Sequence, residues 1–228
     1  MKHYLIIGGS SGIGKSLCDH LISLNNKVTV LSRSSKELVE TEFLSWHACD
    51  ISEETPNFPE IIEPIDGLIY CPGTILLKPF RGLKPADFLA DIQVNYLGAV
   101  RSIQKYLPNL QQGITPSIVL FSTVAVQKGM PFHASIAGAK GAIEGLTVAL
   151  AAEFAPKIRV NAIAPSLTQT PLSEKLLNSE TKLQGAAERH PLKRIGEVKD
   201  MVDAICYLLD ATWVSGHILP VDGGMKKL

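Results

Sequence analysis

The sequence has 228 residues, of which 46% are hydrophobic, and its 22 basic and 22 acidic residues give a formal net charge of zero. A chain of this length and apolar content can bury the core of one large α/β domain, and its balanced charge offers no basic stripe to a nucleic acid or an anionic membrane. The four cysteines are widely separated and lack C-x-x-C spacing, so we expect reduced thiols and no metal site. Without a signal-peptide pattern or an apolar run of roughly 18 residues, the sequence predicts a cytoplasmic protein with no membrane partner.

Apolar runs with strand character alternate with helical patterns along the chain. Strands are predicted at residues 3–7, 27–31, 43–47, 66–70, 116–122, 157–163 and 217–220. Helices are predicted at residues 13–24, 86–108, 134–154 and 198–209, with shorter ones at 36–40 and 59–63. Because strands joined through helices pair in parallel, this pattern indicates an α/β domain with helices on both faces of a parallel sheet.

A glycine-rich turn directly follows the first strand. The apolar run ends at Gly8, and Gly12 and Gly14 complete the spacing G-x-x-x-G-x-G before the first helix. A strand that turns sharply into a helix directs unpaired backbone N–H groups at one point, and glycine lets a phosphate approach the backbone closely. The turn therefore predicts a dinucleotide-binding site, with a tight turn that holds no ligand as the alternative.

The stretch of residues 166–196 interrupts the alternation with short polar helical patterns. In α/β sheets such an insertion usually covers the cleft at the carboxyl ends of the strands, so we expect a lid or substrate-binding insertion. Small residues at Ala137, Gly141 and Gly145 recur every four positions along the predicted helix 134–154. This stripe lets another backbone pack closely, either within the domain or from a second subunit.

Motifs in a fixed order resemble those of the short-chain dehydrogenase/reductase family over the whole chain. They are the glycine loop at 8–14, Asp50 and Ile51, Asn95 within 94–98, Lys140 within 139–142, the segment 159–165 with Thr170 and Pro171, and the C-terminal stretches 191–196 and 216–224. The resemblance implies a doubly wound, parallel seven-stranded sheet (Rossmann fold) in a single domain, residues 1–228, usually as a homodimer or homotetramer with a small-molecule substrate. The cofactor-binding residues it implies are Gly8, Ser10, Ser11, Gly12, Ile13, Gly14, Asp50, Ile51, Gly73, Lys140, Pro165, Thr168 and Thr170.

The end of the second strand indicates which nicotinamide cofactor would bind. A carboxylate there would hydrogen-bond the 2′-hydroxyl of the adenosine ribose and repel a 2′-phosphate. This chain instead has Ser32, Arg33 and Ser34 at that point. The arginine could hold a phosphate through two hydrogen bonds and the serines could donate to it, so the sequence predicts NADP(H).

The catalytic pattern of the family is matched here except at one position. The resemblance implies a tyrosine four residues before the lysine, a serine thirteen residues before that tyrosine, and an asparagine. Counting back from Lys140 reaches Ile136 and then Thr123, whose hydroxyl could replace the serine, with Ser122 adjacent. Asn95 fills the asparagine position. Because isoleucine cannot donate a proton, the usual carbonyl reduction cannot proceed unchanged.

Another proton donor could take the place of the tyrosine. His133 lies seven residues before Lys140, a spacing at which related enoyl reductases have a tyrosine, and histidine can donate a proton. A plain loop histidine is the alternative. The family segment Asn-Asn-Ala-Gly also differs here, since Tyr70, Cys71 and Pro72 precede Gly73. Tyr70 is interpreted as a packing residue rather than a replacement acid.

Two classes of function follow from these residues. The first is an NADP(H)-dependent oxidoreductase with an altered proton donor, which would reduce a conjugated or carbonyl substrate. The alternative is a catalytically inactive NADP(H)-binding protein with a regulatory or partner-binding role. Non-redox chemistry in the same cleft accounts for the remaining possibilities.

Overall fold

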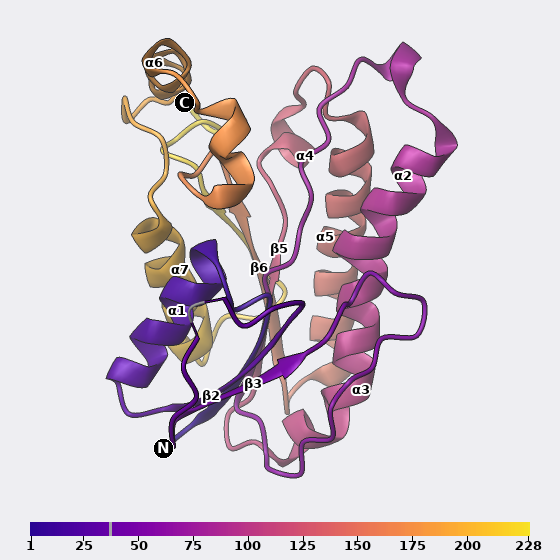
Figure 1. Ribbon diagram of the computed structural model, residues 1–228, viewed down its shortest axis with the longest axis vertical. Coiled ribbons are helices and arrows are strands. Elements are labelled where there is room, and N and C mark those ends of the chain that lie inside the picture. The colour runs from indigo at the N-terminus through magenta and orange to yellow at the C-terminus, as the bar shows by residue number, and fades with distance from the viewer. Residues whose placement is uncertain (37) are drawn as a thin grey trace.

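In the computed structural model, which describes residues 1–36 and 38–228, the chain forms a seven-stranded parallel sheet with helices on both faces (Figure 1). The strands are β1 (His3–Ile7), β2 (Lys27–Ser32), β3 (Leu44–Ala48), β4 (Gly67–Tyr70), β5 (Ser117–Phe121), β6 (Arg159–Pro165) and β7 (Ile218–Val221). Their order across the sheet is β3-β2-β1-β4-β5-β6-β7, with parallel pairing throughout. The predicted Rossmann fold is confirmed, and its strand order reverses between β1 and β4, where such sheets bind ligands.

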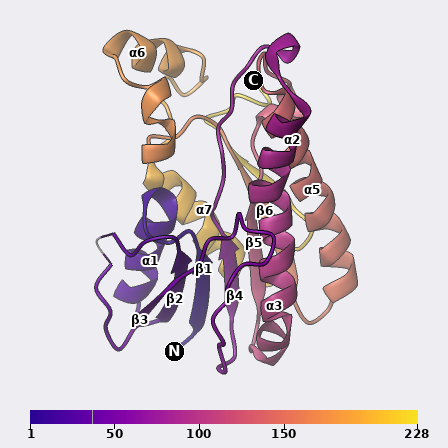
Figure 2. The same cartoon turned by 45° about the vertical axis from the view of Figure 1, so that its right-hand side comes forward.

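Two helical layers cover the sheet. The α-helices are α1 (Gly12–Ser23), α2 (Pro85–Ile92), α3 (Gly98–Gln112), α4 (Ala125–Lys128), α5 (Ala134–Phe154), α6 (Glu180–Glu188) and α7 (Val198–Asp210). Short 3₁₀ helices lie at η1 (Phe80–Gly82) and η3 (Pro171–Leu176), and a π-helical turn lies at η2 (Gln93–Leu97). Helices α1 and α7 lie together on one face, whereas α3 and α5 cover the other, as Figures 1 and 2 show.

The alternation of side chains along each strand divides the core between the two layers. In β1, Leu5 and Ile7 belong to the cluster packed under α3 and α5, whereas Tyr4 and Ile6 belong to the cluster under α1 and α7. Successive residues of a strand point to opposite faces, and both faces of this sheet are covered. The strands therefore read in the sequence as continuous apolar runs rather than alternating ones.

The helix predicted over residues 86–108 is divided into three parts. Helix α2 ends at Ile92, the turn η2 follows, and α3 begins at Gly98. The Gly98 N–H donates to the Gln93 carbonyl, five residues back, while the Tyr70 hydroxyl donates to the Val94 carbonyl at 2.6 Å. Wide turns of this kind occur frequently at functional sites, and this one contains the predicted site residue Asn95.

The two short predicted helices are not confirmed. Residues 59–63 form no helix, because their carbonyls serve other donors: the Tyr106 hydroxyl binds the Pro59 carbonyl, and the Asn109 amide binds the Ile61 and Glu63 carbonyls. Residues 36 and 38–40 are also non-helical, and Glu37, within the predicted helix 36–40, lies outside the described residues. The seven strands and the helices 13–24, 134–154 and 198–209 end within two residues of their predicted bounds.

Neither a membrane-spanning helix nor a metal-binding cluster is found in the part of the chain that the structure describes. No described helix is both long and apolar enough to cross a bilayer. No group of three or more histidine, cysteine, aspartate or glutamate side chains in the same described residues is arranged to hold a metal ion.

Candidate active site

The turn after β1 needs glycine at several of its positions. Gly8 and Gly12 have φ values of +79° and +54°, which residues with side chains rarely adopt. A Cβ on Gly14 would lie 2.4 Å from the Gly8 carbonyl oxygen, and one on Gly9 would lie 2.9 Å from a neighbouring side chain. Helix α1 begins here, and its N-cap residue Ser11 makes no side-chain hydrogen bond to the first turn. The backbone N–H groups of this turn can therefore face a phosphate.

The segment that follows β6 closes over the glycine turn. A Cβ on Gly12 would lie 3.6 Å from Pro171 and 3.8 Å from Thr170. Thr168 forms a parallel bridge with Gly196, which ties the two ends of the 166–196 insertion together. The other predicted cofactor residues at this edge of the sheet are Ser10, Ser11, Ile13 and Pro165.

At the end of β2, Arg33 and Ser34 are exposed but Ser32 is buried. The Ser32 hydroxyl donates to the Ser34 carbonyl at 2.8 Å and accepts the Trp46 indole N–H at 2.9 Å. Because a hydroxyl carries one hydrogen, Ser32 has no donor left for a phosphate and instead supports the turn. The exposed Arg33 guanidinium adds a positive charge next to this turn.

Asp50 follows the neighbouring strand β3. One of its carboxylate oxygens accepts the hydroxyl of Ser52 at 2.6 Å and the N–H of the same residue at 2.9 Å. These two hydrogen bonds, with a smaller contribution from the nearby Arg33, lower the pKa of the Asp50 carboxyl. The adjacent side chain of Ile51 is buried. This corner therefore combines a fixed carboxylate with an exposed guanidinium.

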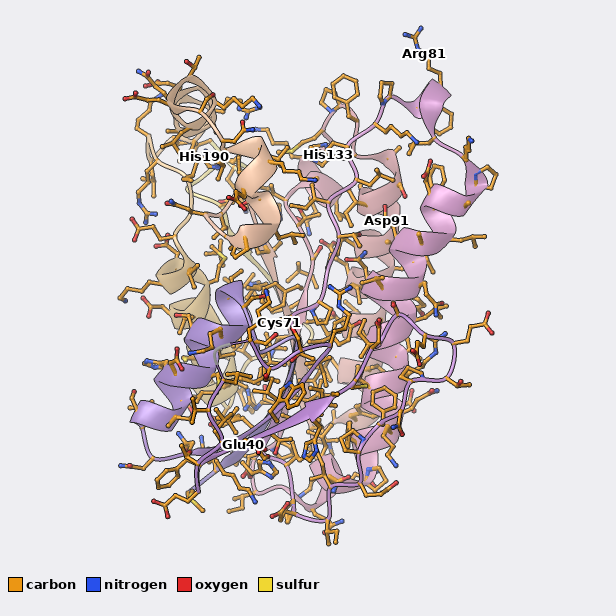
Figure 3. The ribbon with its side chains drawn as sticks, in the orientation of Figure 1. Glu40, Cys71, Arg81, Asp91, His133 and His190 are labelled. Carbon is orange, nitrogen blue, oxygen red and sulfur yellow. The ribbon has the colours of Figure 1, made fainter. Side chains whose placement is uncertain are left out.

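Lys140 on α5 is buried, yet its ammonium forms no hydrogen bond within residues 1–36 and 38–228. A Cβ on Gly73 would lie 3.5 Å from the Lys140 Nζ, so this atom faces the space beside β4. Burial lowers the pKa of Lys140 to about 8, against opposing contributions from Cys71 and Asp91. In Figure 3, Cys71 lies at the centre of the molecule and Asp91 on α2.

Asn95 presents an unused acceptor to the same space. It is fully buried in η2, and its Nδ2 donates to the Thr74 hydroxyl and to the Asp91 carbonyl, both at 2.8 Å. Its Oδ1 has no partner among the described residues, and a Cβ on Gly73 would lie 3.3 Å from it. Asn95 Oδ1 and Lys140 Nζ therefore converge beside Gly73. An unpaired buried acceptor is costly, and a bound ligand or water would satisfy it.

The residues at and beside the positions of the family tyrosine and serine differ in whether they can donate a hydrogen bond to a substrate. Ile136 lies one helical turn before Lys140 and is buried. The Thr123 hydroxyl, just after β5, accepts a backbone N–H at 3.3 Å, so its own hydrogen can be donated elsewhere. Ser122 instead donates its hydrogen to the Glu144 carboxylate at 2.6 Å. Of the two hydroxyls, Thr123 is the one that can still donate to a substrate.

His133 lies at the N-cap of α5 and is partly exposed. Its Nδ1 is 2.7 Å from the Pro131 carbonyl oxygen. Because a carbonyl only accepts, Nδ1 carries a hydrogen, and Nε2 of the neutral ring is an acceptor. His133 can therefore donate from Nε2 only as an imidazolium.

The segment 70–73 packs the site rather than supplying an acid. Burial raises the pKa of the Tyr70 hydroxyl far above its ordinary value, and this hydroxyl is committed to the Val94 carbonyl. The ring of Pro72 lies 3.2 Å from the point that a Cβ on Gly8 would occupy. The interpretation of Tyr70 as a packing residue agrees with these contacts.

The insertion 166–196 is fastened to the sheet by a buried histidine. His190 is 2% exposed; its Nε2 lies 2.8 Å from the Ser166 hydroxyl and its Nδ1 lies 2.8 Å from the Ala186 carbonyl. Figure 3 shows His190 below α6, on the opposite side of the view from Asp91 on α2. Ser166 follows β6 directly, so this contact joins the last turn of the insertion to the end of the strand.

The sequence interpretation missed Asp91, a buried carboxylate at the centre of this site. It is 2% exposed, and its oxygens accept the Thr74 hydroxyl at 2.5 Å and the Ser135 hydroxyl at 2.6 Å. One signal was present in the sequence: an acidic residue four positions before Asn95 shares its helix face. The partners on α5 and after β4 become evident only in the folded chain.

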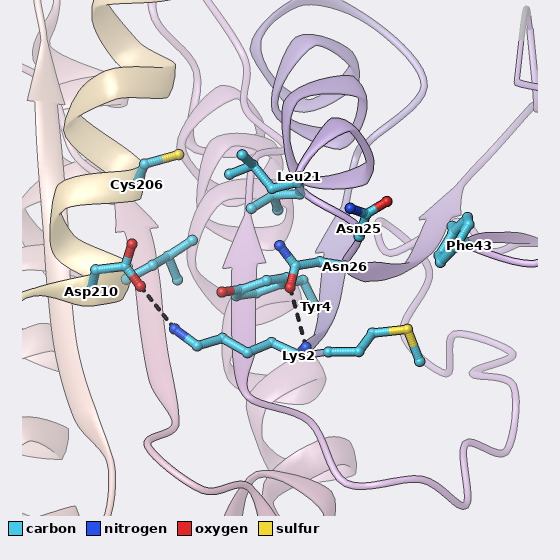
Figure 4. A pocket seen from close by; sticks show the side chains of 11 residues that line it. Lys2, Tyr4, Leu21, Asn25, Asn26, Phe43, Cys206 and Asp210 are labelled. Atoms are coloured by element: carbon cyan, nitrogen blue, oxygen red, sulfur yellow. Dashed lines mark hydrogen bonds and ion pairs between the residues drawn. The ribbon is translucent and has the colours of Figure 1, made fainter.

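A surface depression of about 540 Å³ lies away from these residues, at the amino ends of the strands. Figure 4 shows the ion pair between Lys2 and Asp210, 2.8 Å apart, in this depression, with Tyr4 beside the Lys2 side chain. Because parallel α/β sheets bind ligands at the carboxyl ends of their strands, we assign the functional site to the opposite edge, around the glycine turn.

Known proteins are similar to this chain in sequence and in fold. The family model described as enoyl-(acyl carrier protein) reductase matches residues 9–226. An L-xylulose reductase from Mesocricetus auratus is 30% identical, with 98% of this chain and 96% of that protein covered. A tropinone reductase homologue from Arabidopsis thaliana is 32% identical, with coverages of 97% and 91%.

A solved structure titled ElxO with NADP bound has a TM-score of 0.87 and 27% identity, with 100% of this chain and 99% of that chain covered. A short-chain dehydrogenase family protein from Francisella tularensis superimposes with a TM-score of 0.89 at 22% identity, which supports the fold alone. The glycine turn, the lysine and asparagine beside Gly73 and these full-length matches agree with one another. The chain belongs to the short-chain dehydrogenase/reductase family of oxidoreductases.

Proposed function

We propose that this protein is an NADP(H)-dependent reductase that uses a proton donor other than the tyrosine of its family. The observation that carries the coenzyme assignment is the end of β2, where positions 32–34 hold an exposed Arg33 between two serines and none of the three is the acidic residue that would repel a 2′-phosphate. The tight glycine turn fits a diphosphate. The unpaired Lys140 Nζ and Asn95 Oδ1 fit the hydroxyl-bearing half of the coenzyme, so the residues present suit an NADP(H) molecule.

Each residue of the cleft has a defined role in this proposal. The nicotinamide, when bound, supplies the hydride. Lys140 holds the ribose hydroxyls through its ammonium, and Thr123 donates a hydrogen bond to the substrate oxygen on which negative charge develops. Asn95 satisfies its free Oδ1 with a donor from the ligand or from water.

The coenzyme preference is tested by Arg33→Asp. A charge-assisted hydrogen bond is worth about 1.5–3 kcal/mol, so the variant should bind NADPH at least about tenfold more weakly while binding of NADH changes little or improves. Arg81→Asp is the control, because Arg81 is exposed at η1, at the far end of the molecule in Figure 3. A variant that keeps the full preference for NADPH would contradict the assignment of Arg33.

The proposed substrate class follows from Ile136. Hydride addition to a conjugated enoyl group, a dienoyl group or a quinone gives an anion whose charge is delocalised. This anion need not be protonated as quickly as the alkoxide formed from a simple ketone. A carbonyl substrate would need a strong donor, and the imidazolium of His133 is the candidate at the mouth of the site. General acid catalysis contributes about 10²–10⁴-fold, so this difference would be decisive for an ordinary ketone.

Replacing the isoleucine tests the altered donor. Ile136→Tyr should reduce ketones with NADPH faster than the parent does, whereas Ile136→Phe, which has the ring without the hydroxyl, should not. Oxidation of NADPH is followed by absorbance over a panel of ketones, quinones and conjugated thioesters. Binding of NADPH without turnover over the whole panel would favour the alternative, a coenzyme-binding protein with a regulatory or partner-binding role.

We also propose that two copies of the chain associate through α5. A Cβ added to Gly138 or to Gly145 would have no neighbouring atom within 4 Å among the described residues. Val148, on the same helix, is 55% exposed. A second subunit could approach this helix closely. Gly145→Arg should then convert a homodimer or homotetramer to a smaller species in sedimentation velocity, without loss of the helical circular-dichroism signal.

A further inference from the structure

A carboxylate that no step of the proposed reaction uses lies at the centre of the cleft. Asp91 on α2 is 2% exposed and has no salt bridge within residues 1–36 and 38–228. Ionised carboxylates are almost never buried without a compensating partner, because the loss of hydration is costly. Two hydroxyl groups, one on the loop after β4 and one on α5, direct their hydrogens at its two oxygens, as they would toward a charged carboxylate.

The hydrogen bonds to Asp91 determine which groups donate and which accept between Asn95, Thr74 and Asp91. The Asn95 Nδ2 donates to the Thr74 oxygen, so the single Thr74 hydrogen is free to point to Asp91, at 2.5 Å. The second Nδ2 hydrogen goes to the Asp91 carbonyl at 2.8 Å. A flipped amide would place an oxygen against this carbonyl. The chain of donors therefore fixes Asn95 with Oδ1 toward Gly73.

The Asp91 carboxylate also contributes to the electrostatic environment of Lys140. Two groups, Cys71 and Asp91, act to favour the charged form of this lysine. Both oppose the effect of burial on the lysine pKa, Cys71 more strongly than Asp91. Burial raises the pKa of the Cys71 thiol itself to about 12.

We propose that Asp91 is a positioning residue of this site, which fixes the direction of the Asn95 amide through Thr74 and places a carboxylate in the surroundings of Lys140. Asn95 Oδ1 and Lys140 Nζ then present an acceptor and a donor side by side. A hydroxyl group can satisfy both at once, so the ligand at this point is a hydroxyl of the bound coenzyme or substrate, or a water. This inference rests on the proposed function of the cleft, but both readouts below are taken without coenzyme and substrate.

The other ionisable groups around this cluster have partners of their own or lie outside the contacts described above. Asp87 lies in the first turn of α2 and pairs with Lys78 at 3.1 Å, and Glu144, one turn after Lys140, accepts hydrogen bonds from the Ser122 and Gln127 side chains. His133 lies at the start of α5 and binds the Pro131 carbonyl, and Arg101 on α3 donates to Gln93. Because these contacts do not involve the Asp91 carboxylate, Asp91→Asn removes its charge and leaves the contacts of these neighbours in place.

The first experiment measures the titration of Lys140 in the free protein. Isotope-coded acetic anhydride labels unprotonated amines, and mass spectrometry of the Lys140 peptide gives the extent of labelling at each pH. In Asp91→Asn we expect the midpoint to move to lower pH by about one unit, about a tenfold change in proton activity, because an attractive negative charge is removed. In Asp87→Asn, on the same helix, the midpoint should not move. An Asp91→Asn midpoint equal to that of the parent would overturn the proposal.

The second experiment needs no variant at position 91. In a ¹⁵N–¹H correlation spectrum of the unaltered protein, the Asn95 side-chain amide is assigned from its contacts to Thr74. Both of its hydrogens should exchange with solvent at least about a hundredfold more slowly than those of a surface asparagine, because Asn95 is fully buried and each hydrogen has an acceptor within the protein. Exchange as fast as at the surface would overturn the fixed amide, even if Asp91→Asn failed to fold. Loss of coenzyme binding with both results intact would contradict only the proposed function.

Discussion

Tyr70→Phe tests how the wide turn that carries Asn95 is held. The Tyr70 hydroxyl donates to the Val94 carbonyl at 2.6 Å, within a side chain that is 1% exposed. Removing the hydroxyl leaves this carbonyl without its donor in a buried position. A buried polar group left unsatisfied costs about 1–3 kcal/mol, and the ring itself stays in place, so we expect a loss of about 1–2 kcal/mol in the free energy of unfolding.

The assay is urea unfolding followed by circular dichroism, with the midpoint compared at constant slope. Tyr106→Phe is the matched control, because its hydroxyl donates to the Pro59 carbonyl at 2.9 Å and its side chain is equally buried. Both variants should lose a similar amount of stability, but only Tyr70→Phe should speed hydrogen exchange of the Asn95 amide. A Tyr70→Phe protein as stable as the parent, or equal effects of the two variants on Asn95, would refute the reasoning.

Two further predictions concern stability. Gly98→Ala should lower the free energy of unfolding by about 1–3 kcal/mol, because the added Cβ would lie 2.2 Å from the Tyr70 hydroxyl. In a Tyr70→Phe background the same substitution should lower it by less. Equal losses of stability in the two backgrounds, measured by urea unfolding, would exclude this clash. Burial lowers the pKa of His3, whose ring is bound to Thr29 and to the Pro64 carbonyl, so the unfolded chain binds more protons and stability should fall as the pH drops below about 6.5. His3→Gln should weaken this decline between pH 7.5 and 5.5 in the same assay, and an unchanged slope would show that other groups cause it.

Much of the fold could be predicted because it depends on local patterns. Apolar runs such as His3–Ile7 are buried on both faces, and the helix Ala134–Phe154 lies within its predicted bounds. The π-helical turn could not be predicted in this way. It depends on the Tyr70 hydroxyl at the end of strand β4 and on the space left by Gly98, which are distant from each other in sequence.

The site shows the same division between local and distant information. The glycine turn, Lys140 and Asn95 were identified from motifs, and the structure brings the last two together beside Gly73. The commitment of Ser122 to Glu144, and of Ser32 to Trp46, could not be seen from the chain, since hydrogen-bond partners are chosen only after packing. Asp91 was missed for the same reason: one acidic residue on a helix becomes informative only when its hydroxyl partners are known.

The central claim is that the cleft between the glycine turn and Lys140 holds NADP(H). Calorimetric titration of the purified, unaltered protein with NADPH and with NADH tests it most directly. The account predicts one site per chain with NADPH bound at least about tenfold more tightly than NADH, the difference expected for a charge-assisted contact to the extra phosphate. Absence of binding by either coenzyme, or tighter binding of NADH, would contradict it.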